Sequence, residues 1–382
     1  MIRNRVLPLL LVAGTAAVAG CGFVAVAPNR LLSGEPVGLF AAADRPTSIA
    51  IVALGIALLG IAAMRPSGAL YRAASLLALA LLLLLTAAAG EAALSLTAAG
   101  PPLSRVSLGA AFWVAAAAAA MAIIDSLRRA GAGVGERLAL LAALIAGFAL
   151  MAQAGLFDAL ALAREYRTRE APFAAALVRH VELVVAAVGP AVLIGFPLGT
   201  AAVRRPHWQG PLFAVLNLLQ TIPSIALFGL LIVPLSALAA AVPPLGALGV
   251  AGIGPAPAIV ALILYALLPI VRNTVAGIAG VDPAVVDAAR GMGMTDRQLF
   301  WRVQLPLASP LLLAGLRIVT VQTIGLAVVA ALIGAGGLGV FVFAGLGQYA
   351  VDLVLLGALP TIALALAADF VLQLLSEAAA RQ

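Results

Sequence analysis

The feature that most constrains this chain is a succession of long apolar windows separated by short polar segments. Crossing roughly 30 Å of hydrocarbon takes about 20 consecutive apolar residues in a helix. Ten such windows can be placed by their polar flanks, at residues 6-28, 48-64, 70-90, 107-124, 138-157, 181-203, 211-235, 256-275, 307-333 and 352-376. Because backbone groups in lipid need partners within the segment, and because these windows lack the alternation of a barrel, they predict helices. The predicted fold class is all-α, a polytopic membrane helical bundle of about ten transmembrane helices.

Composition agrees with a membrane protein and excludes several kinds of chemistry. Hydrophobic residues make up 64% of the chain, charged residues 10%, and the mean hydropathy is +1.18. All 22 basic residues are arginine, which excludes a lysine-containing phosphate loop and Schiff-base catalysis. With two histidines and one cysteine, a conventional metal site is not expected. The sequence therefore predicts no enzyme, no catalytic residue and no cofactor or metal in this chain, so that any ATP and Mg²⁺ would be bound by a partner subunit.

Arginines are distributed unequally between the two sets of loops. With the N-terminus inside, the inner loops hold Arg3, Arg5, Arg65, Arg72, Arg128, Arg129, Arg137, Arg204, Arg205, Arg272, Arg290, Arg297, Arg302 and Arg381. The outer loops hold Arg30, Arg45, Arg105, Arg164, Arg167, Arg169 and Arg179. Cytoplasmic loops carry an excess of arginine, so both termini are predicted to be cytoplasmic. The formal charge of +7 then reflects topology and anionic membrane lipid, and no nucleic-acid partner is expected.

Two regions of the chain differ in the polarity of their membrane windows. The charged stretch from Arg164 to Glu170 separates an N-terminal five-span membrane region, residues 1-170, from a core at residues 171-382. The first region is typical of a scaffold, whereas the second carries polar residues and prolines at membrane depth, where such groups usually face a cavity or another helix. The candidates for a translocation pathway or gate, or for hydrogen bonding between helices alone, are Asn217, Gln220, Thr221, Pro223, Thr320, Gln322 and Thr323.

A polar segment, residues 272-306, interrupts the second region. Asp282-Pro283 predicts a helix start, with Asp as the N-cap and Pro in the first turn, where its missing N–H costs nothing. Gly291 and Gly293 predict the end of that helix, because glycine accepts the left-handed conformation of a C-terminal cap. The arginine distribution places the segment in the cytoplasm.

A second helix start follows within the same segment. Thr295 and Gln298 have the spacing of a capping box, and an apolar stripe of Leu299, Phe300 and Val303 comes next. Leu305-Pro306 predicts that this helix stops before the next span. The segment is thus expected to be a compact helix-turn-helix that moves as a unit.

This segment resembles the "EAA" loop of bacterial ABC importer permeases, whose pattern is Glu-Ala-Ala-x3-Gly-x9-Ile-x-Leu-Pro. The chain has Asp in place of Glu and Val in place of Ile. In that family the loop is the coupling helix that docks in a groove of the ATPase subunit. The resemblance therefore implies ATPase coupling by Asp287, Ala288, Ala289, Arg290, Gly293, Leu305 and Pro306.

Other segments resemble permeases of the glycine betaine/choline osmoprotectant importers that carry an extended N-terminal membrane region. The resemblance covers roughly residues 175 to 376 and includes the segments that begin at Gln220, Pro257, Tyr265 and Leu332. It implies a multi-pass permease in the bacterial inner (cytoplasmic) membrane, working by alternating access. The implied partners are a cytoplasmic ATPase dimer, a second permease subunit, most simply an identical copy, and a periplasmic or extracellular solute-binding protein.

Alternatives remain open from the sequence. Another small solute such as methionine fits the same core plan, and an ion-coupled secondary transporter would need inverted repeats and paired intramembrane carboxylates. A membrane-embedded enzyme is also possible, but the chain has few His and Cys residues that could act in catalysis. Asp369 is either a coupling carboxylate or, as we expect, a residue that pairs with an arginine or reaches the membrane interface. The stretch Val18-Ala19-Gly20-Cys21 resembles a lipoprotein cleavage box, although a first membrane span explains it equally simply.

Overall fold

The structure is a computed structural model that describes residues 6–29, 32, 34–64, 67–101, 103–247 and 249–379. Arg3, Arg5, Arg30, Arg65 and Arg381, which contribute to the predicted orientation, lie outside the described residues. The chain divides into two compact units, Met1–Thr168 (unit 1) and Arg169–Gln382 (unit 2). Each unit is described separately below.

In the part of the chain that the structure describes, nine helices are long and apolar enough to cross a membrane. Unit 1 contains α3 (Arg45–Ala63), α4 (Gly68–Ala99), α5 (Ala110–Arg129) and α6 (Val134–Gln153). Unit 2 contains α8 (Glu170–Arg204), α10 (Ser224–Ala241), α12 (Pro255–Ala279), the continuous helical segment Asp296–Ile333, and α17 (Val351–Ala379). The predicted polytopic helical bundle is confirmed.

The first predicted span, 6-28, is wrong in its extent. Helix α1 covers only Val6–Gly20, and the chain then forms strand β1 (Val24–Ala27). This strand is the centre of a three-stranded antiparallel sheet with β2 (Glu35–Val37) and β3 (Arg105–Leu108). Pairing with a strand about eighty residues away is a tertiary effect, which apolar periodicity within one window does not reveal.

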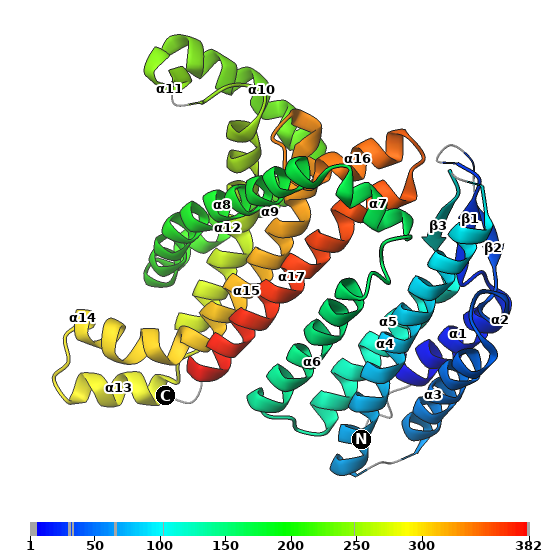
Figure 1. Ribbon diagram of the computed structural model, residues 1–382. Helices are drawn as coiled ribbons and strands as arrows, with labels where there is room; N and C mark the ends of the chain where they lie inside the picture. The colour runs from blue at the N-terminus through cyan, green and yellow to red at the C-terminus, as the bar shows by residue number, and fades with distance from the viewer. Residues whose placement is uncertain are drawn as a thin grey trace. The chain divides into compact units, whose positions relative to one another are not determined.

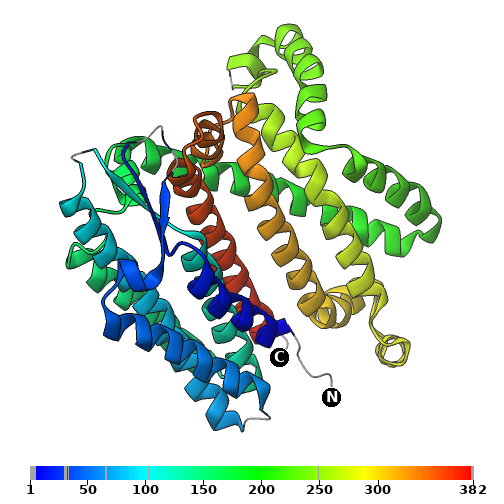
Figure 2. The same ribbon diagram turned by 90° about the vertical axis from the view of Figure 1, so that its right-hand side faces the viewer.

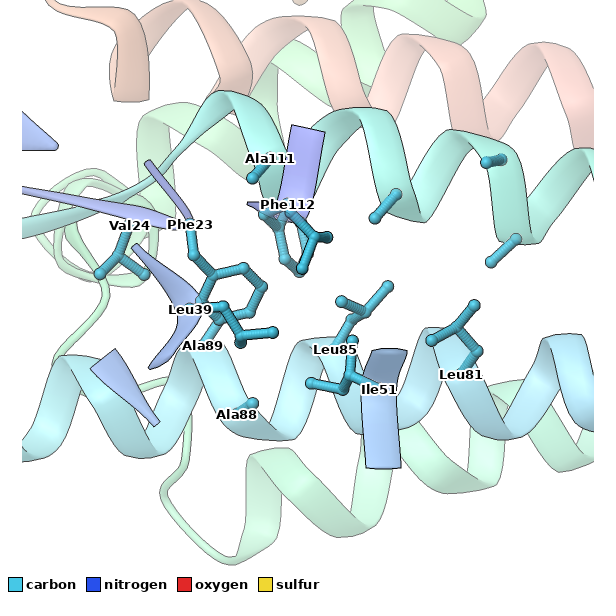
Figure 3. Close-up of a cluster of buried hydrophobic side chains, with 14 of the residues drawn as sticks. Phe23, Val24, Leu39, Ile51, Leu81, Leu85, Ala88, Ala89, Ala111 and Phe112 are labelled. Atoms are coloured by element: carbon cyan, nitrogen blue, oxygen red, sulfur yellow. The ribbon is translucent and has the colours of Figure 1, made fainter. Parts of the chain in front are cut away.

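Unit 1 packs its helices around a core of alanines, leucines and one aromatic pair (Figure 3). Phe23, which precedes β1, meets Phe112 of α5 edge to face, with ring centroids 6.1 Å apart. Ala88 and Ala89 of α4 are buried beside them. Small residues allow helices to approach closely in a membrane, where van der Waals packing is the main driving force for association. The short helices α2 (Leu39–Ala42) and α7 (Ala161–Arg167) complete the unit.

Unit 2 is a bundle in which α12 packs against α8 and α15 (Leu305–Val329), and α15 packs against α17. Gly199 of α8 permits close contact with α12, since a Cβ there would lie 2.6 Å from Cβ of Thr274. Figures 1 and 2 show α13 (Pro283–Gly291) and α16 (Gly339–Gly347) at opposite ends of this bundle. They also show α10 and α11 (Pro243–Ala247) extending away from it.

The predicted span 211-235 is broken in the structure. Helix α9 (Gln209–Thr221) is followed by its C-cap residue, Ile222, and α10 begins at Ser224. Pro223 disfavours a helical conformation in the residue before it and cannot donate a backbone hydrogen bond. The carbonyl of Ile222 instead accepts a hydrogen bond from the Tyr265 hydroxyl of α12, so a side chain from another helix satisfies the exposed backbone group.

The predicted helix stop at Leu305-Pro306 is also wrong. Helix α14 (Asp296–Leu299) passes through a π-helical turn, η2 (Phe300–Gln304), directly into α15 and its 3-10 extension η3 (Ala330–Ile333). Pro306 lies in the first turn of α15, after the wider turn in which the Leu305 N–H donates to the Phe300 carbonyl. The proline is therefore accommodated by widening the helix rather than by ending it.

Candidate coupling element and intramembrane polar sites

Helices α13 and α14 start where the sequence predicts, and their caps explain why. The Asp282 carboxylate accepts a hydrogen bond from the Ala284 N–H at 2.9 Å, and Pro283 occupies the first turn. Thr295 and Gln298 form a reciprocal capping box at the start of α14. Gly293, in the turn between the two helices, has φ +83°, a left-handed backbone conformation that residues with a side chain disfavour. The predicted helix-turn-helix is confirmed at these points.

The coupling element, defined as residues 282-306, has a buried side and an exposed side. Ala289, Leu299 and Phe300 are buried, while Asp287 and Arg290 are exposed and lie 3.9 Å apart as a surface pair. The apolar stripe predicted from Leu299 onward therefore packs inward, as an amphipathic helix requires. Ala288 and Gly293 are exposed, as is Pro306, whereas Leu305 is half-buried.

Three large apolar side chains remain exposed on this element. Val285, Met292 and Trp301 are 40%, 72% and 55% exposed. The sequence analysis did not identify these three residues. Large apolar residues within a short, charged segment are the feature that could have indicated a contact surface. Such side chains on an otherwise polar surface mark a place where another protein or a membrane is contacted.

Aromatic contacts anchor the element to the end of the bundle. The Phe300 ring lies 6.5 Å from Phe196 of α8, and the Arg204 guanidinium lies 5.4 Å from the Phe300 centroid. Phe300 also belongs to a small core with Ile278 and Ala308. Because α14 continues through η2 into α15, displacement of α14 would reach the far end of a 38-residue helical segment without crossing a loop. Helix α13 is joined to α14 by the short turn that contains Gly293.

The pathway candidates form two separate groups. On α9, Asn217 accepts a hydrogen bond from Arg272 at 3.3 Å and Gln220 donates to the Tyr265 carbonyl at 2.8 Å. The Thr221 hydroxyl donates to the Leu218 carbonyl in its own helix, and Pro223 follows at the helix break. These polar groups therefore tie α9 to α12 beside that break.

The second group lies on α15. Thr320 donates to the Leu316 carbonyl at 2.8 Å, Thr323 is buried, and Gln322 is half-buried. Thr320 also lines an apolar cavity of about 520 Å³ between α8, α15 and α17. Among the described residues, no hydrogen bond joins this group to the one on α9.

Asp369 of α17 pairs with Arg317 of α15, as the sequence analysis expected of an arginine partner. The pair is bidentate, with Arg317 Nη2 donating to Oδ2 at 2.7 Å and Nε donating to Oδ1. Both side chains are about one-third exposed. Paired in this way, two costly charges within spanning helices hold those helices together.

The glycine-rich turn after α15 is tightly packed against α8. Gly337 has φ +82°, and a Cβ there would lie 3.1 Å from Nδ1 of His180. His180 is fully buried, and its Nε2 lies 3.1 Å from the Ile324 carbonyl. Arg179 donates to the Ala335 carbonyl at 3.2 Å. The turn is thus a fixed junction of helices in this structure.

These features together define a class of protein: a polytopic membrane permease core with a structured loop presented at one end of its helices. Two family models match the chain. Residues 3–163 match the N-terminal domain of the ABC transporter permease YehY, and residues 191–381 match the binding-protein-dependent transport system inner membrane component. The chain belongs to the latter family, and as such it is the membrane permease component of an importer that works with an ATPase and a solute-binding protein.

Curated relatives match about half of the chain. The choline transport system permease protein OpuBB of Bacillus subtilis is 39% identical over 193 residues, 50% of this chain and 82% of the relative. The osmoprotectant import permease protein OsmW of Salmonella typhimurium is 42% identical over 194 residues, 51% of this chain and 85% of the relative. A solved structure of the MetNI methionine ABC transporter aligns with a TM-score of 0.48 and 22% identity, over 55% of this chain and 96% of that chain.

Proposed function

We propose that this permease couples a partner ATPase to alternating access through the coupling element. The observation that carries the proposal is the combination of two capped short helices, an exposed apolar triad and an unbroken connection into α15. Asp287, Ala288, Arg290 and Gly293 lie on the exposed part of the element. Ala289 supports it from within, and Leu305 and Pro306 join it to the span. ATP-driven closure of the partner would displace this unit and, through α15, rearrange the helices that surround the solute.

The proposed cargo is a small osmoprotectant such as glycine betaine or choline. Support comes from the named substrates of the relatives, since choline, carnitine and glycine betaine permeases of Bacillus subtilis are 36–39% identical to this chain. Tight recognition of a quaternary ammonium uses an aromatic cage, and only 5% of this chain is aromatic. We therefore expect selection to reside mainly in the solute-binding protein, with weak binding along the path here.

The proposed path includes the group on α9 (Asn217, Gln220, Thr221 and Pro223) and the group on α15 (Thr320, Gln322 and Thr323). Both groups lie on helices of unit 2, and the group on α9 is next to the break between α9 and α10, where these helices could change their relative orientation. The hydroxyls of Thr221 and Thr320 bond carbonyls of their own helices. Asn217 and Gln220 instead bond residues of α12, so movement of α9 relative to α12 would have to break those two bonds. Family membership favours this ATP-driven reading over an ion-coupled transporter.

The proposed assembly contains two copies of this chain, an ATPase dimer in the cytoplasm and an external solute-binding protein. Helix α10 supports a second membrane subunit, because Leu230 and Val233 are 63% and 74% exposed and need cover from protein or lipid. Both termini are proposed to be cytoplasmic, on the side of the coupling element. ATP and Mg²⁺ would be held by the ATPase, with no cofactor and no enzymatic step in this chain.

Substitution of the exposed triad tests the coupling proposal. Met292→Glu should abolish solute uptake and solute-stimulated ATP hydrolysis in vesicles containing the full transporter, while the amount of inserted protein stays the same. Met64→Glu is the matched control, because Met64 is 65% exposed at the end of α3 in unit 1. Normal uptake by the Met292→Glu transporter would contradict the proposal.

The buried side gives a second, distinguishable result. Ala289 is only 2% exposed, so a charge there disrupts the packing of the element itself, and Ala289→Glu should lose uptake together with binding of the ATPase. A pull-down of the ATPase subunit by the inserted permease measures this loss. Retained ATPase binding would show that α13 is not part of the contact.

A further inference from the structure

A basic and aromatic surface lies at the end of α8, where Arg204 also contacts Phe300 of the coupling element. Between Glu182 and Asp282 the sequence contains no acidic residue, and its arginines are Arg204, Arg205 and Arg272. Among the described residues, none of these three arginines forms an ion pair. No carboxylate of the described residues therefore pairs with these three guanidinium groups.

The local fold holds these guanidinium groups against aromatic rings. Helix α8 ends at Arg204, and a single 3-10 turn, η1 (Pro206–Trp208), connects it to α9. The Arg205 guanidinium lies 4.7 Å from the centroid of Trp208, whose side chain is 46% exposed. Stacking orients a guanidinium without neutralising it, so its N–H donors remain available for an anion.

The place of this surface in the fold identifies the kind of anion. Arg204 is the last residue of a membrane-spanning helix, and tryptophan and arginine at such ends lie at the level of the lipid headgroups. Gly199 packs against Thr274, and Arg204 stacks on Phe300, so the surface belongs to the same end of unit 2 as the coupling element. Phosphate is the anion present at that depth, and arginine binds it with paired hydrogen bonds.

We infer that Arg204, Arg205 and Trp208 form a binding site for the phosphate headgroup of an anionic phospholipid. Arg272 adds to the attraction from the end of α12, where its guanidinium lies 6.0 Å from the Phe213 ring. Because Arg204 also contacts Phe300, the bound headgroup lies beside the π-helical turn that carries α14. This inference goes beyond the proposed transport function and does not depend on the identity of the solute.

Tryptophan quenching by brominated lipid provides the test. In the full chain with Trp113→Phe and Trp301→Phe, Trp208 is the single tryptophan, since the chain has three. Reconstitution into vesicles of phosphatidylcholine and phosphatidylglycerol, with bromine on the acyl chains of one lipid at a time, gives the relative binding constant at Trp208. We expect phosphatidylglycerol to be favoured by about fivefold for each arginine, or about twenty-five-fold for the pair.

Charge variants distinguish a site from general attraction. Arg204→Gln/Arg205→Gln should bring the ratio close to one, whereas Arg204→Lys/Arg205→Lys should keep most of it. Arg128→Gln/Arg129→Gln is the matched control and should leave the ratio unchanged, because it removes another adjacent pair at the end of a span, where Arg129 already pairs with Asp125 at 2.7 Å. Equal elution and helix content of the variants establish that they fold.

Four outcomes would overturn the inference. These are a ratio near one in the parent protein, a ratio unaffected by Arg204→Gln/Arg205→Gln, an equal loss in the control, and loss of the preference when inorganic phosphate replaces chloride at constant ionic strength. The last would assign the surface to free phosphate rather than to lipid.

Discussion

Unit 1 and unit 2 are both helical membrane bundles, but their most buried ion pairs lie in different places. In unit 1 the most buried of the described ion pairs joins Arg105 of β3, 24% exposed, to Glu165 of α7, 1% exposed, and so lies outside the spanning helices. In unit 2 the Arg317–Asp369 pair joins two spanning helices, and one span is broken at Pro223. The difference means that relative movement of two spanning helices would have to break the most buried ion pair of unit 2, whereas the corresponding pair of unit 1 does not join spanning helices.

The largest loss of stability is expected when the buried member of the Arg105–Glu165 pair is removed, and an exposed pair of unit 1 provides the comparison. Glu165 is 1% exposed and lies 2.5 Å from Arg105, which is 24% exposed, so Glu165→Ala should cost unit 1 about 3 kcal/mol, the lower end of the range for a buried pair, by leaving a mostly buried charge without its partner. Asp158→Ala, which breaks an exposed pair with Arg167, should cost about 0–1 kcal/mol. Thermal melting followed by size-exclusion chromatography measures both, and equal costs would contradict the described packing.

In unit 2, Asp369→Ala should cost less than Glu165→Ala but impair transport more. Since both members of the Arg317–Asp369 pair are about one-third exposed, we expect about 2 kcal/mol, below the range for a fully buried pair. Uptake in reconstituted vesicles measures the loss of transport, and thermal melting measures the loss of stability. The exchange Arg317→Asp/Asp369→Arg should recover stability; failure to do so would mean that the pair does more than join α15 to α17.

A smaller effect tests whether the glycine-rich turn is a fixed junction. Gly337→Ala should cost about 1–2 kcal/mol for the left-handed backbone, and more because its Cβ would lie 3.1 Å from His180. Gly249→Ala, at φ +86° with nothing within 4 Å, isolates the backbone contribution. Melting temperatures of the two variants should therefore differ, and identical values would show that the contact with His180 is unimportant.

The smallest expected change concerns the helix break. Tyr265→Phe removes the hydrogen bond to the Ile222 carbonyl and should cost about 1 kcal/mol. Hydrogen exchange should increase locally at the start of α10, while exchange in α4 of unit 1 stays the same. An unchanged rate at Ser224–Ala241 would indicate that Pro223 alone maintains the break.

Local chemistry explains which parts of the candidate site were predictable. Asp282, Thr295 and Gln298 act on backbone groups two or three residues away, so their spacing was sufficient to predict the caps. Pro306 was misread as a stop, because widening of the helix at η2 depends on how Phe300 packs against Phe196 and Ala308. The exposed Met292 and Trp301 were missed, since exposure is a property of the assembled unit.

The sequence by itself determined the membrane class, the helical character of the spans and the capped element, because hydropathy and capping act over one segment at a time. Tertiary structure decided the rest. Strand β1 depends on β3, the break at Pro223 depends on Tyr265, and the partner of Asp369 is fifty-two residues away. Contacts between distant segments are set by packing of the whole unit, which no single window contains.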